Sequence, residues 1–536
     1  MWYVTDLGES VQDIRNIIRV TASHILELIK DITKTVRRNM EIITGSFLRA
    51  LRFLCLSLLF SGPLATGQAI QYYVNCSSPT PGNGSSTAPW NSLGQANGFT
   101  FQPGDILSLT SNVTCNGTLA PLGSGNNTAP IQITTYPIDS TAGPAIINGG
   151  GSNFSLTLTN QDYWRITNLS ITNPASELGP RQGIFVAASD SKIHYGITID
   201  HNIVYDVAGQ TNKATYASDF AKSAGIAISA SNGSRFDDVS VRDNTVHDCG
   251  GGAIKVRPGQ TYSLSQNVRV SYNKISSCGG DGIIIATSDS PSIDHNVAAY
   301  LGMGKYPWTG GNFAGMWVET SQDPVISHNV VHNTIMSAYD SEAFDCDLGV
   351  TGTCTVEYNY SHDNAGGAFL NCDGCGTTAG TVSKQVVRYN IFERDCRIIS
   401  VGTLPELWFY NNIIYCPDRP FDINVPPTTH FVNNIFVGIQ PNASLPTGSG
   451  INWRSNMFQT VLPPTENGIV GDPKFIDPGL TGNTLGAGFG YRVRTGSAAL
   501  DGGALVVANG NQDFFGNAVQ SNVVPNVGVY NGPGVN

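Results

Sequence analysis

Charged residues are scarce in this 536-residue chain, in which Asp, Glu, Lys and Arg together make up only 13%. Acidic residues outnumber basic ones, so the formal net charge is -11. No basic stripe and no glycine-rich phosphate loop with its lysine stands out from the composition. Because a negative chain repels nucleic acid and anionic membrane surfaces, we expect nucleic acid to be absent from its partners.

The chain also lacks an apolar run of the roughly 20 residues that a membrane-spanning helix needs. Its apolar run from Phe53 to Phe60 follows Arg49 and Arg52 and precedes Pro63-Leu64-Ala65-Thr66-Gly67. This order is typical of a secretory signal peptide, which we place at residues 40–67. Residues 1–39 carry apolar residues at helical spacing and are interpreted as an extension from a misassigned start. The alternative is a type II membrane anchor, but we expect no stable membrane insertion.

Lys, Glu and Leu are few, whereas there are 60 glycines and many Asn, Ser, Thr and Val residues. That balance favours many short strands joined by tight turns. The sequence opens after the signal with Tyr72-Tyr73-Val74, Pro89-Trp90-Asn91-Ser92-Leu93 and Pro103-Gly104-Asp105-Ile106-Leu107. We expect a strand, a short helix and a second strand there, forming the N-terminal cap of a coiled architecture.

Ten of the eleven cysteines remain after Cys55 leaves with the signal, an even number that suits a disulfide-bonded secreted protein. The ten N-x-Ser/Thr sequons point to a glycoprotein of a eukaryotic secretory route, with some sequons buried. Cys372 and Cys375 have metal or redox spacing but no second such pair, so we interpret them as disulfide-bonded. Cys249 and Cys278 each precede a Gly-Gly pair at equivalent places, which predicts a disulfide between them.

One short pattern recurs from about residue 160, namely Val/Ile-x-x-Asn-x-Ile/Val followed by a glycine-rich turn. From Asn244 to Asn456 its asparagines are 22 to 33 residues apart. That period, without the helices of leucine-rich or ankyrin repeats, indicates a solenoid of stacked β-coils. An asparagine at the same place in each coil predicts a hydrogen-bonded ladder along the stack. The asparagines assigned to it are Asn168, Asn202, Asn244, Asn273, Asn296, Asn329, Asn359, Asn390, Asn412, Asn434 and Asn456.

This repeat resembles the right-handed parallel β-helix, or pectate-lyase-like, superfamily over roughly residues 70–460. The resemblance implies an all-β solenoid with N- and C-terminal caps, and it leaves function open because the superfamily holds lyases, hydrolases, isomerases and adhesins. Residues 461–536 resemble the closing segment of secreted β-helix carbohydrate enzymes. We interpret them as a C-terminal cap over the last open edge.

A second strand can be aligned between repeats, and it predicts which residues face outward. Its segments are Gly225–Ser229, Ala253–Arg257, Gly282–Ala286, Gly315–Glu319, Ala343–Asp347 and Ala368–Cys372. Positions two and four are nearly all apolar, so positions three and five point out. The outward pairs are Ala227/Ser229, Lys255/Arg257, Ile284/Ala286, Trp317/Glu319 and Asp345/Asp347.

The alignment predicts a catalytic cluster of Glu319, Asp345 and Asp347 on two neighbouring coils. Carboxylates this close raise at least one pKa, as a general acid requires. Trp317 offers an apolar platform for a sugar ring. The alternative is that these outward carboxylates only keep the surface soluble. Glu342, Asp340 and Asp363 are expected on flanking turns, solvated or capping, although Asp340 and Asp363 can reach over the groove; His362 is interpreted as a turn residue.

A narrower resemblance joins the acidic stretch from Glu342 to Asp347 with the segment from Val356 to Gly367. Both resemble the Gly-Phe-Asp-x-Asp and Tyr-Asn-Tyr-Ser-His-Asp-Asn segments of secreted β-helix glycoside hydrolases, including those similar to lacto-N-biosidases and β-xylosidases. Family acids in that segment fall on Asp345 or Asp347. Glu342-Ala343 stands where Gly-Gly is usual, so the resemblance does not assign the partner acid.

Three functions fit these residues. The first is a secreted, extracellular and monomeric glycoside hydrolase that needs no cofactor, acts on a polysaccharide or oligosaccharide, and uses Glu342, Asp363, Lys255 and Arg257 with Trp317 to bind it. The second is a polysaccharide lyase in which Lys255 or Arg257 abstracts a proton and the acidic cluster holds Ca²⁺. Against the lyase, Lys255 is expected to lie roughly 10 Å from Glu319. Among hydrolases of this fold, the pectinase type usually has Gly-His-Gly and Arg-Ile-Lys motifs, and this sequence has neither. The third is a non-enzymatic adhesin or glycan-binding module.

Overall fold

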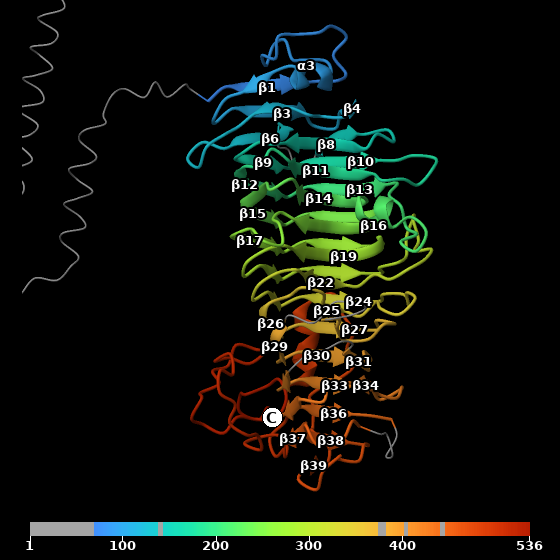
Figure 1. Cartoon of the computed structure of the whole chain (residues 1–536), viewed down its shortest axis with the longest axis vertical. Helices are drawn as coiled ribbons and strands as arrows, with labels where there is room; N and C mark the ends of the chain where they lie inside the picture. The colour runs from blue at the N-terminus through green and yellow to red at the C-terminus, as the bar shows by residue number, and fades with distance from the viewer. Residues whose placement is uncertain (1–68, 138–142, 374–381, 401–405, 440–444) are drawn as a thin grey trace, which may run out of the picture. The chain divides into compact units, whose positions relative to one another are not determined.

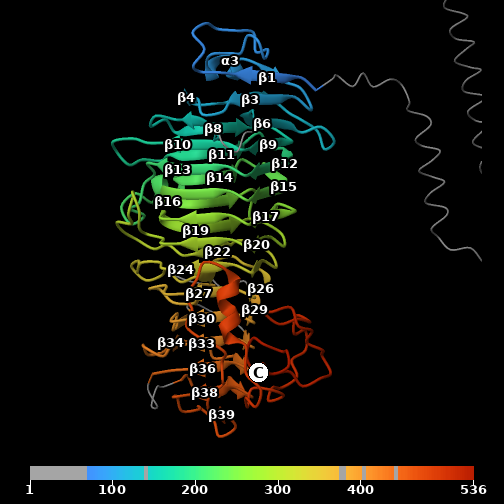
Figure 2. The same cartoon turned by 180° about the vertical axis from the view of Figure 1, so that it is seen from behind.

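The computed structural model describes residues 69–137, 143–373, 382–400, 406–439 and 445–536. The expected upstream extension and signal peptide lie outside these residues. Residues 69–536 form one unit in which parallel strands stack into a right-handed β-helix (Figures 1 and 2). Within the described residues, every helix is too short or too polar to cross a bilayer.

Each coil contributes strands to three parallel sheets, here named sheet 1, sheet 2 and sheet 3, and β16 runs through both sheet 2 and sheet 3. Sheet 1 contains β1 (Gln71–Val74), β3 (Ile106–Thr110), β6 (Ile131–Tyr136), β9 (Trp164–Thr167), β12 (Ile193–Asp200), β15 (Arg235–Arg242), β17 (Val268–Ser271), β20 (Ser292–Asp294), β23 (Val325–Ser327), β26 (Gly352–Glu357), β29 (Val382–Arg388), β32 (Leu407–Tyr410), β35 (Thr429–Val432) and β37 (Ile451–Arg454). Sheet 2 contains β4 (Thr114–Asn116), β7 (Ala145–Asn148), β10 (Leu169–Asn173), β13 (Ile203–Val207), β16 (Thr245–Arg257), β18 (Lys274–Ser276), β21 (Val297–Ala299), β24 (Val330–His332), β27 (Tyr360–His362), β30 (Ile391–Glu393), β33 (Ile413–Tyr415), β36 (Ile435–Val437), β38 (Met457–Gln459) and β39 (Ile469–Val470).

Sheet 3 carries the acidic cluster. Besides β16 it contains β8 (Phe154–Thr159), β11 (Gln182–Ala188), β14 (Ala224–Ala230), β19 (Gly279–Ala286), β22 (Met316–Glu319), β25 (Phe344–Cys346), β28 (Phe369–Asn371), β31 (Arg397–Ser400) and β34 (Asp422–Asn424). A small separate sheet pairs β2 (Thr100–Phe101) with β5 (Leu122–Gly123). The helices in the described part of the chain are α3 (Leu93–Asn97), α4 (Ala217–Ala221) and the 3₁₀ helix η1 (Leu485–Tyr491). The strand, short helix and second strand expected at the start are thus β1, α3 and β3.

Alternation of apolar residues builds the core, because the inward side chains stack from coil to coil. On sheet 1 one such column consists of fully buried residues, namely Ile166, Ile199, Val241, Val270, Ile293, Ile326, Val356, Val387, Phe409 and Phe431. Each residue is held in register by parallel backbone pairing with its neighbours in the column. This fixed register is what makes outward positions predictable from one coil to the next.

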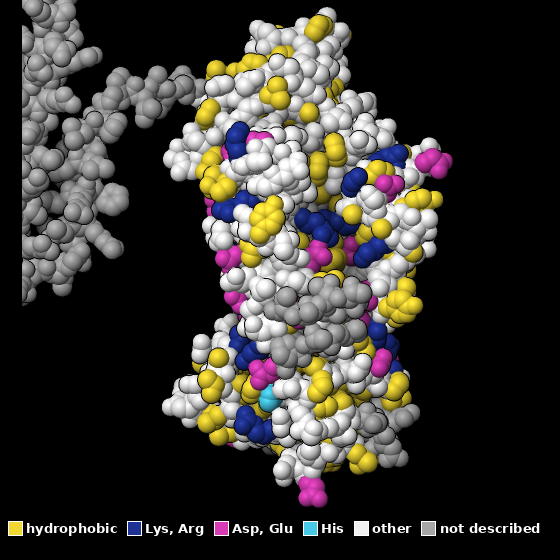
Figure 3. Space-filling view, viewed as in Figure 1, with side chains coloured by type: hydrophobic (Ala, Val, Ile, Leu, Met, Phe, Trp, Pro, Cys, Tyr) yellow, Lys and Arg dark blue, Asp and Glu magenta, His cyan; other side chains and the backbone are white. Residues whose placement is uncertain are grey.

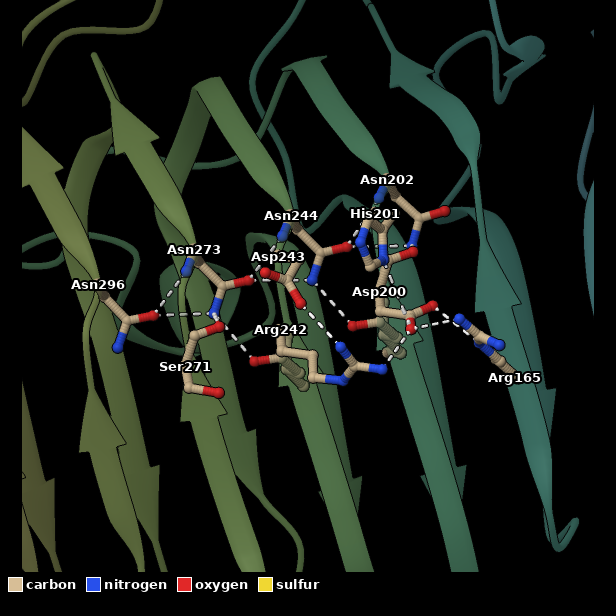
Figure 4. Close-up of polar contacts among 12 residues, drawn as sticks. Arg165, Asp200, His201, Asn202, Arg242, Asp243, Asn244, Ser271, Asn273 and Asn296 are labelled. Atoms are coloured by element: carbon tan, nitrogen blue, oxygen red, sulfur yellow. Dashed lines mark hydrogen bonds and ion pairs between the residues drawn. The ribbon is translucent and has the colours of Figure 1, made fainter. Parts of the chain in front are cut away.

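The predicted asparagine ladder runs along the corner between sheets 1 and 2 (Figure 4). Asn244 is typical of it, because its Nδ2 donates to Asn273 Oδ1 at 3.0 Å and to Ile199 O at 2.9 Å. The same contact between neighbouring asparagines continues to Asn434 and Asn456, where it measures 2.9 Å. The residue before each ladder asparagine has a left-handed backbone, as at His201 with φ of 56°. The ladder thereby satisfies the buried amides of the turn.

Asn168 is the exception, so its assignment to the ladder was wrong. Thr167 pairs with Asp200 and Ser170 pairs with Ile203, so Asn168 occupies the left-handed position one residue early. Leu169 stands in the ladder position, and its backbone N–H donates to Asn202 Oδ1 at 3.1 Å. The ladder therefore begins at Asn202.

The predicted disulfide-bonded character is present, but the predicted Cys249–Cys278 disulfide is not. Disulfides join Cys76 to Cys115, Cys346 to Cys354 and Cys396 to Cys416, and Cys372 is also disulfide-bonded. Cys249 and Cys278 are buried free thiols on adjacent coils.

The C-terminal segment packs along the flank of the coil as well as following its last strand. Phe475, Tyr491 and Val529 join a buried cluster with Tyr360 and Ile413 of sheet 2. In Figure 2, the ribbon of η1 crosses this flank at the level of β27 and β30. The segment therefore covers outward apolar residues of sheet 2 that would otherwise contact water.

Candidate active site

The two outward columns predicted on sheet 3 are those of the structure. Lys255 pairs with Ala227 and Ile284, Ile284 pairs with Trp317, and Trp317 pairs with Asp345. In the second column Arg257 pairs with Ser229, and Glu319 pairs with Ala286. The backbone N–H of Asp347 donates to Val318 O at 2.9 Å, which continues the pairing and places Asp347 beside Glu319.

Asp345 and Asp347 differ in their access to solvent. Asp345 is 4% exposed, and within the described residues its Oδ1 has no hydrogen-bond partner. Burial raises the pKa of Asp345 well above its usual range, and the neighbouring Asp347, Glu342 and Asp340 carboxyls add to the shift. Asp347 is partly exposed. Burial raises its pKa to about 6, although a hydrogen bond from the Leu348 backbone N–H opposes the shift.

Glu319 is the third carboxylate that the sequence predicted for this cluster. It is partly exposed and forms an ion pair with Arg257. Arg257 lies two coils away along the same column, so its side chain passes over Ala286, which is 1% exposed. The nearby Glu319 carboxyl helps to raise the pKa of Asp347.

Trp317 is not the open platform that the sequence predicted. Its side chain is 6% exposed and packs with Ile284 and Ala314. Its indole Nε1 donates to Asp281 Oδ1 at 3.1 Å, and the Lys213 ammonium lies 5.9 Å from its ring centroid. The chain segments that carry Lys213 and Ala314 are inserted between strands and cover the ring. Trp317 therefore lies beneath these segments and offers little exposed surface to a sugar.

Lys255 is also largely buried, and its assignment as a substrate-binding residue stays a prediction. Its Nζ donates to Phe220 O at 2.9 Å and lies 3.6 Å from Asp281 Oδ2. Burial lowers its pKa to about 7, although Asp281 opposes that shift. Phe220 of α4 lies over the Lys255 ammonium and shields most of the side chain from water, although Lys255 also helps to line a hollow on sheet 3.

Glu342 is fully buried, and the expectation of a solvated turn residue was wrong. Its Oε1 accepts a hydrogen bond from Arg397 Nη1 at 2.6 Å. Burial raises its pKa to about 8 against the opposing charge of Arg397. Asp340 lies nearby, is partly exposed, and has its pKa raised by burial although Lys213 and Arg397 lower it.

Asp363 lies away from the cluster, at the end of β27 in sheet 2. It forms two hydrogen bonds of 2.6 Å with Arg394 and accepts one from His362 Nδ1 at 2.9 Å. These contacts lower its pKa to about 2 in spite of the desolvation that burial brings. Asp363 is therefore a structural ion-pair residue, and it cannot reach the groove of sheet 3.

Sequence reasoning missed Lys213, Asp281 and Arg397. Lys213 belongs to an insertion between strands, and the backbone N–H of Lys213 donates to Gly310 O at 2.8 Å. Its charge lowers the pKa values of Asp340, Asp345 and Asp347. Asp281 could have been noticed as an acidic residue inside an apolar strand, whereas an insertion such as that of Lys213 has no repeat to align. Among the described residues, no group of three or more His, Cys, Asp or Glu side chains has a metal-binding arrangement.

The comparisons with known proteins agree with this fold. A family model for the right-handed beta helix region matches residues 154–332. A lacto-N-biosidase of Bifidobacterium longum subsp. longum is 25% identical over 589 residues, which cover 85% of this chain and 36% of that protein. This chain thus spans little more than a third of the length of that curated relative.

Two solved structures share the architecture. Both are of a GH136 lacto-N-biosidase from Eubacterium ramulus at 18% identity. The selenomethionine derivative has a TM-score of 0.54 and covers 84% of this chain and 74% of its own. The native protein has a TM-score of 0.53 and covers 83% and 73%. The chain is therefore a right-handed parallel β-helix that resembles carbohydrate-active enzymes, glycoside hydrolases among them.

Proposed function

We propose that this protein is a secreted glycoside hydrolase that cleaves cell-wall or extracellular glycans with carboxylates on the outward face of sheet 3. The observation that carries the proposal is the juxtaposition of Asp345, Asp347 and Glu319 on adjacent coils, with raised pKa values at both aspartates. Glycoside hydrolysis needs one protonated and one ionised carboxyl close to the same bond. Environments that push such pKa values apart are the usual mark of this pair.

Asp347 is the proton donor in this proposal. It is partly exposed, and with a pKa of about 6 it carries a proton in mildly acidic solution. Asp345 is buried beside it, and burial together with the Asp347 carboxyl raises the pKa of Asp345 well above its usual range. The second carboxylate in this proposal is Glu319, which pairs with Arg257, or Asp340, which is also partly exposed.

Secretion is part of the proposal and is supported by the disulfides of the described chain, because such bonds persist in oxidising compartments. The sequons agree with it in part. Asn359 cannot carry a glycan, because it is a fully buried member of the ladder, whereas Asn83, Asn112 and Asn126 are exposed.

The test is a glycan panel assayed for new reducing ends, with the protein beginning after Gly67. The hydrolase is expected to release reducing ends without absorbance near 235 nm and without sensitivity to EDTA. Products that absorb there and vanish with EDTA would instead establish a Ca²⁺-dependent lyase. Asp347→Asn is expected to lower kcat at least 100-fold, since general acid catalysis contributes roughly 10²–10⁴-fold. The assignment of the catalytic carboxylates would be wrong if full activity remained in each of four variants, namely Asp345→Asn, Asp347→Asn, Glu319→Gln and Asp340→Asn.

A further inference from the structure

Sheet 3 carries a hollow of about 440 Å³ on the N-terminal side of the acidic cluster. Its floor is the coil of β14, where both outward residues, Ala227 and Ser229, are small. The preceding coil carries Phe185 in register with Ala227, and the next coil carries Arg257 in register with Ser229. The hollow thus exists because small side chains separate an aromatic coil from a cationic one.

The aromatic side of the hollow is half of a stack. The rings of Phe154 and Phe185 are stacked, with centroids 4.7 Å apart and planes 19° from parallel. Phe154 comes from β8, the coil before β11, so it covers the face of Phe185 that points away from Ala227. The other face of Phe185 is directed at the hollow, where a flat or apolar ring face would continue the stack.

The opposite side of the hollow is cationic. Lys222 is exposed at its rim, and Arg257 lines it while also pairing with Glu319. Figure 3 shows Lys and Arg side chains gathered at the level of β14 and β16, with Asp and Glu side chains beside them toward β19. A ligand that stacks on Phe185 therefore meets positive charge at its far edge, and a carboxylate there gains charge-assisted hydrogen bonds.

We propose that this hollow binds a pyranose ring bearing a carboxylate, such as a uronic acid, in the glycan that the acidic cluster cleaves. Cleavage of the bound glycan rests on the proposed function, whereas binding in the hollow does not. Four coils separate Ser229 from Asp347, which is about 19 Å at 4.8 Å per coil. The ion pair of Arg257 and Glu319 bridges part of that interval. The substrate is therefore an oligosaccharide or polysaccharide chain in which the acidic sugar is several residues from the scissile bond.

Binding is tested without catalysis, on an Asp347→Asn variant, by calorimetry with two oligosaccharides that differ only in carrying one glucuronic acid. All samples also carry Asn153→Gln, because Asn153 heads a sequon and lines the hollow. The acidic oligosaccharide is expected to bind at least tenfold more tightly. Equal binding of the two oligosaccharides would overturn the proposal.

Two further variants locate the contact. Ala227→Phe fills the hollow and Phe185→Ala removes the platform, and each is expected to weaken binding of the acidic oligosaccharide at least tenfold. Thr157→Ala, which lies one coil beyond Phe185 in the same column, is the matched control and is expected to bind normally. Unchanged binding in both hollow variants, with normal thermal unfolding, would overturn the proposal.

Catalysis separates the two proposals. Ala227→Phe in the active protein is expected to raise KM for the long acidic substrate at least tenfold, whereas the control Thr157→Ala is expected to leave that KM unchanged. If no substrate is hydrolysed but acidic oligosaccharides still bind through Phe185, the hydrolase proposal fails and the binding site stands. If hydrolysis of long substrates is indifferent to Ala227→Phe, the hollow plays no part in substrate recognition.

Discussion

The ammonium group of Lys213 lies 5.9 Å from the ring centroid of Trp317, above the column that continues to Asp345. The lysine comes from an insertion between β13 and α4, more than one hundred residues before the carboxylates that it influences. It is thus the positive group that limits how far burial raises the pKa values of Asp345 and Asp347.

Lys213→Met is expected to move the pH profile of hydrolysis. Removing the positive charge favours the protonated form of Asp347, so its pKa rises further above about 6. The decline in kcat with increasing pH, which reports loss of that proton, should shift to higher pH. The measurement is kcat between pH 4 and 9, with Lys192→Met as a control at an exposed lysine outside the site. A profile that stays in place or moves to lower pH would contradict the role given to Lys213.

Asn329→Ala is expected to lower the free energy of unfolding by about 3 kcal/mol, because it leaves buried backbone groups without partners. Asn329 Oδ1 accepts from the Asn296 backbone N–H at 2.9 Å, and its Nδ2 donates to Ile293 O at 2.9 Å. Chemical denaturation measures the loss. Ser327→Ala is the matched control, since Ser327 faces outward two residues earlier in the same coil. Similar losses in the two variants would show that the ladder contributes nothing special.

His328 is expected to make the fold less stable in acid. Burial lowers its pKa to about 4, and the stacked His295 adds to that effect. Because the unfolded state binds a proton near pH 6.5, stability is full above that pH and falls between pH 6.5 and 4. His328→Tyr keeps a ring in the stack, as Tyr272 and Tyr358 do on other coils. Its melting temperature should depend less on pH in this range, and an unchanged dependence would exclude His328 as the cause.

Cys249 and Cys278 are expected to react as free thiols once the protein is unfolded. Alkylation in denaturant without a reductant, followed by peptide mapping, should find both residues modified. The same treatment of the native protein should leave both unmodified, because they are buried. Recovery of a peptide in which the two cysteines are joined would restore the disulfide that the sequence suggested.

The sequence predicts the parts of this structure that repeat. Lys255, Trp317, Asp345 and Glu319 fall on the expected columns because an inward apolar residue at every second position fixes the outward ones. Asn168 was misplaced because an asparagine one residue early resembles the ladder residue in sequence, although the backbone gives it a different role. Burial was the harder property to predict, since insertions and later coils impose it.

Glu342 illustrates that limit. It follows a turn and looks solvated in the sequence, yet the chain around Arg397, two coils later, closes over it. Trp317 looked open for the same reason, because residues that cover it belong to segments outside the repeat. The outward position of a carboxylate that alternates with apolar residues can be predicted from sequence, but its degree of burial depends on residues that are distant in the sequence.

The disulfide between Cys346 and Cys354 starts at the residue that separates Asp345 from Asp347. It ties β25, which bears Asp345 and directly precedes Asp347, to β26 of sheet 1. The disulfide thus adds a covalent link to the backbone pairing that sets the positions of the two aspartates. For the secreted hydrolase proposed above, the oxidising compartment that preserves this disulfide would also keep that added support for the two aspartates.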